Sequence, residues 1–417
     1  MNMRKRVVIT GLGAVTPLGD DVPTLWEGLL AGRSGVGPIT LFDPSDLEVR
    51  IAAEVKDFDP VALFGRRKAR RNDRFTLFAL EAARQAVDDA GLQFEEEHGR
   101  DVGVIIGSAI GGILTLLENY DVLKASGPRR VSPFMAPMMM PNAASATVAI
   151  TYGLQGPNLC VASACATGSH AIGEAAEVIR RGDADTMICG GSEAVVAALS
   201  LSAFKNMGAV STRNDEPERA SRPFDAGRDG FVMGEGAGVL VLESLERARR
   251  RGVRVYCELV GYGASADAFH ITAPEEAGQG AAWAMERALR DAGLASEEVD
   301  YINAHGTSTP LNDRTETQAI RAVFGSHADR LVVSSTKSMV GHLMGAAGAV
   351  EAIACVKSLE TGWVHPTLNY ETPDPECDLD YVPNEARRLV PGVVLSNSFG
   401  FGGHNGCLIF RRWEGET

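Results

Sequence analysis

Cys165 lies in a segment whose pattern is typical of an activated thiol. An apolar run ends at Ala162, and a helix of small residues is predicted from Ala166 to Arg181. This order predicts a strand, a sharp turn and a helix, with the sulfur at the helix N-terminus. Unpaired N–H groups and the dipole at that end stabilise a thiolate and can also hold an oxyanion. A buried structural cysteine is the alternative, because free cysteines are usually buried.

Two histidines occupy similar positions in the second half of the chain. His305 and His342 each follow a short predicted strand and a loop of small or polar residues. Ligand sites in α/β sheets collect at the carboxyl ends of strands, although a structural histidine is the alternative for each. Lys337 lies in an apolar neighbourhood, and we expect it to orient His342 or to tune the pKa of that imidazole. Glu316, near the start of a helix predicted from about residue 313, is the expected partner of Lys337.

A glycine-rich loop follows near the C-terminus. Four glycines lie among residues 400–406, next to Phe399 and Phe401. Glycine permits unusual backbone angles and a close approach to a ligand. The loop is therefore expected to form a flexible wall whose backbone N–H completes an oxyanion hole. A plain turn between two strands is the alternative.

A basic run stands out in an acidic chain. The chain has 417 residues and a formal net charge of −14, which disfavours a nucleic-acid partner. A local run of like charge is usually a solvated face, but the contrast in sign predicts docking of an acidic partner or a phosphate. The residues of this expected docking surface are Arg66, Arg67, Lys68, Arg70 and Arg71, with Arg129, Arg130 and Lys205 as additions.

Composition indicates a globular protein of the cytoplasm. Hydrophobic residues make up 45% of the chain and charged residues 23%, the usual balance for a soluble fold. Seven cysteines at irregular spacing, several of them in apolar runs, indicate reduced thiols rather than a disulfide framework. The apolar residues 7–10 predict a first strand that runs into a glycine turn. No apolar stretch is long enough to predict membrane insertion.

Alternating short apolar strands and amphipathic helices predict an α/β fold. The two halves also resemble each other. Residues 82–92 and 285–294 are predicted helices that both close on Asp-Ala-Gly-Leu, where glycine is a natural left-handed cap, and a strand follows each one. A second, weaker echo pairs the helix after Cys165 with one predicted over residues 343–359. We expect duplicated units at residues 1–253 and 254–417, together forming one domain of about residues 3–412. Chance similarity of Ala/Gly-rich helices is the competing view.

These segments together resemble the β-ketoacyl-[acyl-carrier-protein] synthases, specifically the elongating condensing enzymes. The resemblance covers nearly the whole chain, and three segments match the family's catalytic motifs in order: residues 163–168, 303–310 and 337–342. It implies a thiolase-like fold of five layers, α-β-α-β-α, a homodimer, and an acyl carrier protein as partner. The family uses no cofactor beyond the 4′-phosphopantetheine arm on which the carrier brings the substrates.

The resemblance also implies roles for individual residues. Cys165 takes the acyl group, His305 and His342 serve decarboxylation, and Lys337 supports the site, paired with Glu316. The remaining roles are an oxyanion hole from the backbone N–H groups of Cys165 and Phe401, a gate at Phe401 and Phe399, an acyl pocket at Ile110 and, across the dimer, Phe134, and a pantetheine site at Thr307 and Thr309.

The implied reaction is decarboxylative Claisen condensation, which extends a Cys165-bound acyl chain by two carbons from malonyl-carrier. Five alternatives stand beside it. A degradative thiolase uses a second cysteine near the C-terminus, where this chain has Phe399 and His404. An initiating synthase pairs its cysteine with one histidine and an asparagine. A polyketide ketosynthase is closer to this chain. A non-catalytic chain-length subunit lacks the nucleophile, and a zinc site of one cysteine and two histidines lacks ligand spacing.

Overall fold

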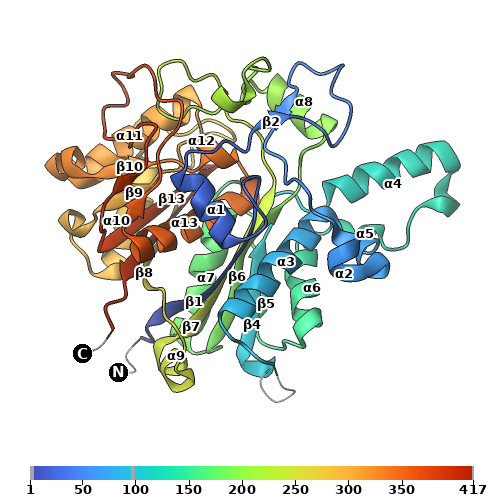
Figure 1. Cartoon of the computed structure of the whole chain (residues 1–417), viewed down its shortest axis with the longest axis horizontal. Helices are drawn as coiled ribbons and strands as arrows, with labels where there is room; N and C mark the ends of the chain where they lie inside the picture. The colour runs from blue at the N-terminus through green and yellow to red at the C-terminus, as the bar shows by residue number, and fades with distance from the viewer. Residues whose placement is uncertain (1–3, 95–98, 416–417) are drawn as a thin grey trace.

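In a computed structural model of the protein, which describes residues 4–94 and 99–415, one mixed sheet of ten strands runs through the molecule (Figure 1). The strands of its N-terminal half pair in the order β1-β7-β6-β4-β5. Only the pairs β6–β4 and β4–β5, toward the outer edge of the sheet, are parallel. These strands are β1 (Val7–Val15), β4 (Val102–Gly107), β5 (Asn158–Leu159), β6 (Thr186–Glu193) and β7 (Gly236–Ser244).

The C-terminal half repeats this connectivity. Its strands pair in the order β8-β14-β13-β9-β10, and again only the pairs toward the outer edge, β13–β9 and β9–β10, are parallel. The halves join where β1 pairs with β8 at Val8–Glu258 and Ile9–Cys257. The boundary near residue 253 stays a prediction. These strands are β8 (Cys257–Ala266), β9 (Tyr301–Asn303), β10 (Val332–Ser334), β13 (Val393–Gly400) and β14 (His404–Arg412).

Helices complete five layers, as the resemblance implies. α7 and α13 pack against each other between the two half-sheets, while one pair of helices covers the outer face of each half: α3 and α6 the N-terminal one, α10 and α11 the C-terminal one. Each interface buries an apolar cluster, which fixes the layers because apolar burial dominates folding. The helices are α3 (Arg74–Asp89), α6 (Ala143–Tyr152), α7 (Thr167–Arg181), α10 (Gln279–Ala292), α11 (Pro310–Phe324) and α13 (Ala347–Thr361).

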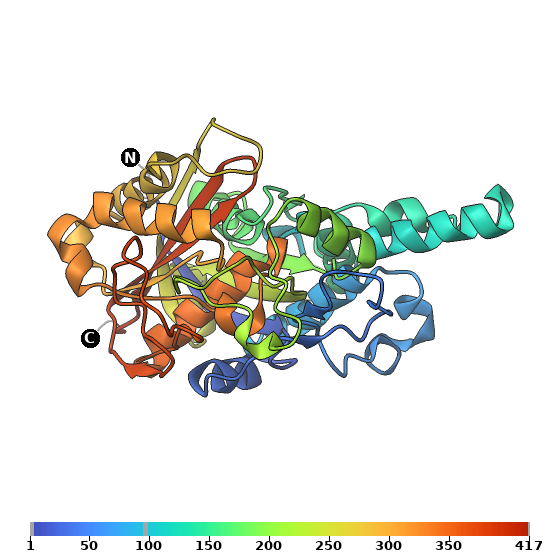
Figure 2. The same cartoon turned by 90° about the horizontal axis from the view of Figure 1, so that it is seen from above.

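Smaller elements lie around these layers. Figure 2 shows that α4 extends away from the body of the molecule. Among the described residues, no helix has the length and apolar character needed to cross a membrane. The other helices are α1 (Val22–Leu30), α2 (Pro60–Ala69), α4 (Ile113–Ser126), α5 (Met135–Met139), α8 (Ala198–Asn206), α9 (Leu245–Arg251) and α12 (Lys337–Val340), and the short strands are β2 (Gly37–Pro38), β3 (Ile51–Ala52), β11 (Trp363–Val364) and β12 (Arg387–Arg388). Single 3₁₀ turns are η1 (Gly99–Asp101), η2 (Pro128–Arg130), η3 (Pro217–Arg219), η4 (Ser296–Glu298), η5 (Gly325–Arg330) and η6 (Met344–Ala346).

The structure corrects two predicted boundaries. The glycine turn expected after residue 10 is wrong, because β1 continues through Gly11 and Gly13 to Val15. A side chain at either glycine would meet the backbone of α3, since a Cβ there would lie 2.1 Å from the Ala86 oxygen or 1.9 Å from the Ala82 oxygen. The helix expected from residue 343 begins only at Ala347, after a 3₁₀ turn.

Candidate active site

A tight turn presents the sulfur of Cys165 at the start of α7. The preceding residue, Ala164, has φ +50°, a left-handed conformation that costs a non-glycine residue about 1–2 kcal/mol. Hydrogen bonds hold this turn, since Thr167 Oγ1 accepts from the Ser163 N–H at 2.8 Å and the Ser163 oxygen accepts from the Ala166 N–H at 3.2 Å. The strained turn thereby aims the thiol into the cavity, as the sequence predicts.

The two histidines meet the cysteine from the other half of the molecule. The Cys165 sulfur and one imidazole nitrogen from each of His305 and His342 all lie within 4.8 Å of one another. The imidazole rings stand edge to face with their centroids 5.5 Å apart. All three side chains are buried, with exposed fractions of 9%, 2% and 2%. The site therefore gathers a nucleophile and two imidazoles in one small, water-poor volume.

Hydrogen bonds fix the tautomer of each imidazole. His342 Nδ1 accepts from the backbone N–H of Met344 at 3.2 Å. The ammonium of Lys337 lies 3.3 Å from His305 Nδ1 and donates to it. In both rings the proton therefore resides on Nε2. Two neutral rings with Nε2–H groups can donate hydrogen bonds to a developing negative charge.

Lys337 does not have the partners expected from the sequence. Its ammonium forms a buried ion pair with Glu351 and donates to the carbonyl oxygen of His305 at 2.6 Å. With the contact to His305 Nδ1, all three of its N–H donors are used. The predicted orientation of His342 by Lys337 and the predicted pairing with Glu316 are therefore wrong, whereas the predicted effect on the pKa of His342 agrees with the charge of Lys337, which lowers it. Lys337 instead fixes the position and tautomer of His305.

Glu316 supports the same histidine in another way. Its two carboxylate oxygens accept from the backbone N–H groups of His305 and Gly306, each at 2.8 Å, and the Asn397 amide donates to it at 3.2 Å. Burial raises the pKa of Glu316 to about 7, against the opposing effect of these hydrogen bonds. The carboxylate thus holds the loop after β9 that carries His305.

Burial governs the protonation of the reactive groups. It raises the pKa of the Cys165 thiol to about 11, while the charge of Lys337 and a hydrogen bond from the Phe401 backbone N–H oppose that rise. Burial, and next the charge of Lys337, hold the pKa values of His305 and His342 well below their usual range. The resting site therefore holds a thiol and two neutral imidazoles. When the thiol loses its proton during the reaction, the charge of Lys337 and the Phe401 backbone N–H stabilise the thiolate.

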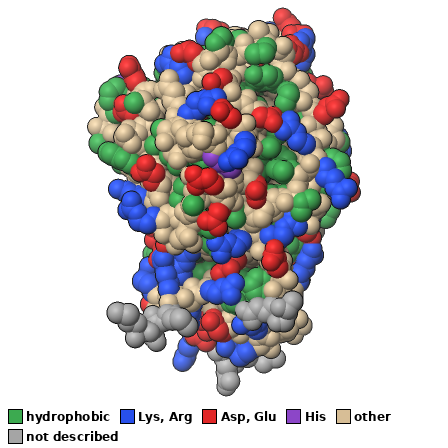
Figure 3. Space-filling view, turned by 90° about the vertical axis from the view of Figure 1, so that its left-hand side faces the viewer, with side chains coloured by type: hydrophobic (Ala, Val, Ile, Leu, Met, Phe, Trp, Pro, Cys, Tyr) green, Lys and Arg blue, Asp and Glu red, His purple; other side chains and the backbone are tan. Residues whose placement is uncertain are grey.

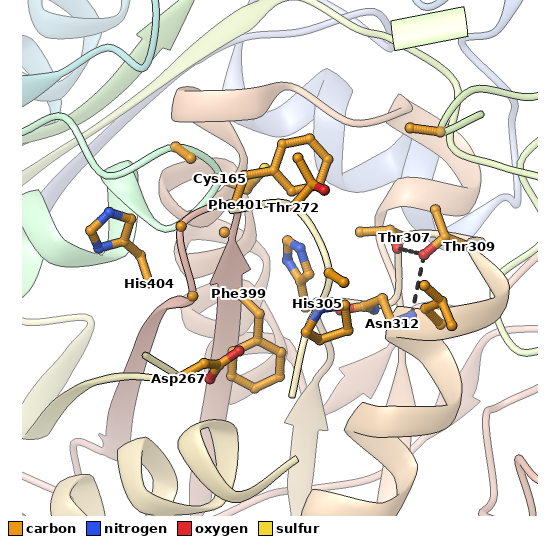
Figure 4. Close-up of a pocket in the computed structure, with 18 of the residues that line it drawn as sticks. Cys165, Asp267, Thr272, His305, Thr307, Thr309, Asn312, Phe399, Phe401 and His404 are labelled. Carbon is orange, nitrogen blue, oxygen red and sulfur yellow. Dashed lines mark hydrogen bonds between the residues drawn. The ribbon is translucent and has the colours of Figure 1, made fainter. Parts of the chain in front are cut away.

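The site opens into a cavity of about 690 Å³. Its lining includes Cys165, His305 and His342 together with Ile110, Thr307 and Thr309. Figure 4 shows Phe401 beside Cys165 and the two threonines beyond His305. The hydroxyls of Thr307 and Thr309 lie 2.9 Å apart. The predicted nucleophile, gate, acyl-pocket and pantetheine residues thus share one cavity, with Phe134 as the exception.

The remaining predicted residues lie outside this cavity. Phe134 is 41% exposed, and the guanidinium of Arg71 lies 4.7 Å from its ring centroid. The residues of the expected docking surface are divided among separate elements. The run from Arg66 belongs to α2 and the turn after it, Arg129 and Arg130 lie in η2 beyond the end of α4, and Lys205 lies in α8, paired with Glu48 at 2.8 Å.

Sequence reasoning missed two buried carboxylates at the site. Glu351 is a lone acidic residue in the otherwise apolar stretch 347–356 of α13, and that contrast is the signal that could have revealed it. Glu193 ends β6 and accepts from the Ala109 N–H at 2.7 Å and the Gly345 N–H at 3.0 Å. It therefore ties the loop that carries Ile110 to the segment that follows His342.

The triad of one thiol and two imidazoles also has the donor set of a zinc site. A dication there would lie beside the ammonium of Lys337, which is 3.3 Å from His305 Nδ1. At such short range in a buried site, like charges repel strongly. The ion pair between Lys337 and Glu351 offsets part of this repulsion, so elemental analysis is the test that decides on a zinc site.

A buried histidine behind the site makes stability depend on pH. His365 Nδ1 donates to the Pro366 oxygen at 3.0 Å, and its Nε2 lies 3.2 Å from both the Tyr301 hydroxyl and the Asn303 amide. Burial lowers the pKa of His365 to about 4. The unfolded chain, with a histidine pKa of about 6.5, therefore binds more protons between pH 6.5 and 4. We expect His365 to reduce the free energy of unfolding as pH falls through that window, by about 3 kcal/mol in full.

The variant His365→Gln isolates this contribution. Urea unfolding of both proteins between pH 7.5 and 5 should show wild type losing about 2 kcal/mol more than the variant, because 1.5 pH units of the window are crossed. Parallel pH profiles of the two proteins would contradict the assignment.

Comparison with known proteins agrees with this geometry. The N-terminal domain family of beta-ketoacyl synthases matches residues 4–248, and the C-terminal domain family matches residues 256–371. The 3-oxoacyl-[acyl-carrier-protein] synthase 2 of Synechocystis sp. is 53% identical over 411 residues, which is 99% of each chain. That of Coxiella burnetii is 53% identical, over 98% of this chain and 99% of its own.

Solved structures extend the likeness to the fold. A type II polyketide ketosynthase in complex with its acyl-carrier protein superposes with a TM-score of 0.91 at 36% identity. The match covers 98% of this chain and 100% of that one. Because both halves of the family and the full length of curated relatives match, this chain belongs to the beta-ketoacyl synthase family.

Proposed function

We propose that the protein is a 3-oxoacyl-[acyl-carrier-protein] synthase that elongates acyl chains by decarboxylative condensation in fatty acid biosynthesis. The observation that carries this proposal is the meeting of Cys165, His305 and His342 within 4.8 Å in the wall of one cavity. One nucleophile and two neutral donors are the groups that this reaction requires. The relatives from Synechocystis and Coxiella bear the name of this activity.

The first half-reaction transfers an acyl group to the enzyme. The Cys165 sulfur attacks the thioester carbonyl of an acyl-carrier, the carbon–sulfur bond to the carrier breaks, and the carrier thiol leaves with the proton of Cys165. The carbonyl oxygen becomes an oxyanion during this step. We assign the stabilisation of this oxyanion to the backbone N–H groups of Cys165 and Phe401, because hydrogen bonding from the Phe401 N–H already opposes the rise in the pKa of the Cys165 thiol.

The second half-reaction makes and uses a carbon nucleophile. Malonyl-carrier loses CO2, and the electron pair of the broken bond becomes an enolate. The Nε2–H groups of His305 and His342 donate to the enolate oxygen. The enolate carbon then attacks the acyl carbonyl on Cys165, and the Cys165 thiolate leaves and takes up one proton. The product is a 3-oxoacyl-carrier that is longer by two carbons.

The lining of the cavity supports the substrate-binding roles that we propose. Ile110 lines the end that we assign to the acyl chain, with Phe134 reaching that end in a partner subunit. Thr307 and Thr309 line the region beyond His305, where their hydroxyls can hold the amide groups of the pantetheine arm. We assign the gate to Phe401, which lies beside Cys165 (Figure 4), and to Phe399, whose ring centroid lies 5.8 Å from that of His305.

Mass spectrometry tests the proposed function directly. Intact protein incubated with a long-chain acyl-carrier should gain one acyl group, and peptide mapping should place it on Cys165. Addition of malonyl-carrier should then release CO2 and a 3-oxoacyl-carrier two carbons longer. An adduct on another residue, or no adduct at all, would overturn the proposal. Elemental analysis of the same sample separates this function from a zinc site.

We further propose a homodimer. α4 extends from the body with Leu116, Tyr120 and Leu123 at 40%, 54% and 41% exposure, and Ile150 on α6 is 81% exposed. In the same half of the molecule, β5 forms an edge of the sheet. Apolar surface of this kind marks an interface. Light scattering at micromolar concentration should give twice the chain mass, whereas a monomer would contradict the proposal.

The basic residues of α2 form the proposed docking surface for an acyl carrier protein in the cytoplasm. Arg66, Arg67 and Arg70 lie on α2 and the turn that follows it. On the opposite face of the molecule, shown in Figure 3, basic and acidic side chains are interspersed. A run of one sign steers an acidic partner mainly by raising the association rate.

Charge reversal at Arg67 and Lys68 should weaken the use of acyl-carrier by about 10-fold or more, because rim charges act on association. Use of acyl-pantetheine, which lacks the carrier, should change little. The measurement is kcat/KM for both substrates, and the effect on the carrier should shrink at high salt. Equal losses on the two substrates would refute this docking surface.

A further inference from the structure

His170 bridges two segments that both border the reactive sulfur. It lies on α7, one turn beyond Cys165, with 9% of its surface exposed. Its Nδ1 lies 2.6 Å from Ser163 Oγ, in the turn before the nucleophile. Its Nε2 lies 3.1 Å from the backbone oxygen of Asn405, at the start of β14. One imidazole thus links the nucleophile turn to the strand that follows the glycine-rich loop.

The partners of His170 fix the direction of both hydrogen bonds. The Asn405 carbonyl can only accept, so His170 Nε2 carries the proton and donates it. Nδ1 is then an acceptor for the Ser163 hydroxyl. Burial lowers the pKa of His170, which favours this neutral form. Each end of the ring therefore has one defined role.

The fold makes room for this bridge with two glycines. A Cβ at Gly406 would lie 3.0 Å from a ring carbon of His170, and a Cβ at Gly173 would lie 2.4 Å from the ring of Tyr262, which packs edge-on against His170. A side chain at position 406 would displace the imidazole, and one at position 173 would displace the Tyr262 ring that packs against it. The ring is held by packing as well as by hydrogen bonds.

The bridge spans the two sources of the oxyanion hole. The Cys165 N–H comes from the nucleophile turn, and the Phe401 N–H comes from the loop that leads to Asn405. Between them, Gly400 packs directly on the turn, since a Cβ there would lie 2.9 Å from the Cys165 nitrogen. Asn405 is also anchored on its far side, because its amide donates to Asp267 at 2.7 Å.

We propose that His170 is a positioning residue that sets the distance between the two backbone donors of the oxyanion hole. This inference rests on the proposed function. It predicts a split between the half-reactions, because acyl transfer to Cys165 needs both donors, whereas loss of CO2 from malonyl-carrier relies on His305 and His342. A residue that only stabilises the fold would affect both half-reactions alike.

Two variants separate the ends of the bridge. His170→Asn keeps an acceptor near the Nδ1 position and loses the donor to Asn405, and His170→Gln keeps a donor near the Nε2 position and loses the acceptor for Ser163. Tyr262→Phe is the matched control, because it keeps the ring that packs on His170 and loses only a hydroxyl bonded to Glu174 at 3.3 Å.

The experiment measures two rates on each protein: single-turnover acylation of Cys165 by an acyl-carrier, and CO2 release from malonyl-carrier without an acyl donor. We expect His170→Asn to slow acylation by about 10- to 100-fold, since deletion of a whole oxyanion donor costs about 10²–10³. His170→Gln should slow it less, and CO2 release should stay within about 2-fold in both variants, a range too small to reflect a lost donor. Tyr262→Phe should match wild type.

Equal loss of both rates, or no loss of acylation in either variant, would overturn the role of His170 and leave the proposed function standing. Wild-type protein that is not acylated on Cys165 would overturn the proposed function itself.

Discussion

Replacement of Cys165 with alanine is expected to abolish the acyl adduct and to lower condensation by about 10³-fold or more, because the covalent intermediate has no other acceptor. Release of CO2 from malonyl-carrier should persist within about 10-fold, since the Nε2–H donors of His305 and His342 do not depend on the sulfur. Intact mass spectrometry measures the adduct, and trapping of CO2 from labelled malonyl-carrier measures the second reaction.

Cys160 supplies the matched control. It lies five residues earlier, is less buried than Cys165, and burial raises the pKa of its thiol as well. Cys160→Ala should keep the full adduct and full condensation activity, because Cys160 is not among the residues that line the cavity. An adduct that survives in Cys165→Ala and disappears in Cys160→Ala would reverse the assignment of the nucleophile.

The grouping of Cys165, His305 and His342 could be predicted from the sequence because each of these residues follows a local pattern. Cys165, His305 and His342 each come after a strand and a run of small residues, and such patterns report a strand end whatever the rest of the chain does. The repeated Asp-Ala-Gly-Leu endings also describe real helix ends, since Gly91 and Gly293 have φ +59° and +65°. Patterns of this kind depend on neighbouring residues in the sequence, so they can be recognised without knowledge of the packing.

Packing between distant elements could not be predicted in the same way. Gly11 and Gly13 suggested a turn, yet they lie within β1 because α3 presses on them. The place of Glu316 near the start of a predicted helix and the family resemblance predict it as the partner of Lys337, but the actual partner depends on α13, which brings Glu351 into the core. The partner of a buried charge is set by neighbours in space, which the local sequence does not reveal. This is why the position of Cys165 at the start of a helix could be predicted and the partner of Lys337 could not.

Lys337→Met is expected to damage both stability and catalysis. It leaves the Glu351 carboxylate buried and unpaired, and breaking a buried ion pair from one side costs about 3–5 kcal/mol. It also removes the donor to His305 Nδ1, so that the Nε2–H tautomer is no longer enforced. Decarboxylation should fall by about 10²-fold, as expected when an aligned donor is lost. Urea unfolding and CO2 release measure the two effects separately.

The double variant Lys337→Met with Glu351→Met separates the charge from the tautomer. Replacing both members of a buried pair with apolar side chains is often neutral or stabilising, so the double variant should regain most of the lost stability. It should not regain decarboxylation, because His305 still lacks its donor. Equal recovery of both properties would show that Lys337 acts only through stability.

The stability lost in the single variant should also depend on pH. Burial raises the pKa of Glu351, and the charge of Lys337 opposes that rise, so removal of Lys337 raises the pKa further. A carboxyl group whose pKa is higher in the folded state than in the unfolded chain destabilises the protein as pH rises above the unfolded value of about 4.3. The difference in unfolding free energy between wild type and Lys337→Met should therefore shrink as pH falls from 8 toward 5. A difference that stays constant across this range would mean that the carboxyl group of Glu351 finds another partner when the ammonium is gone.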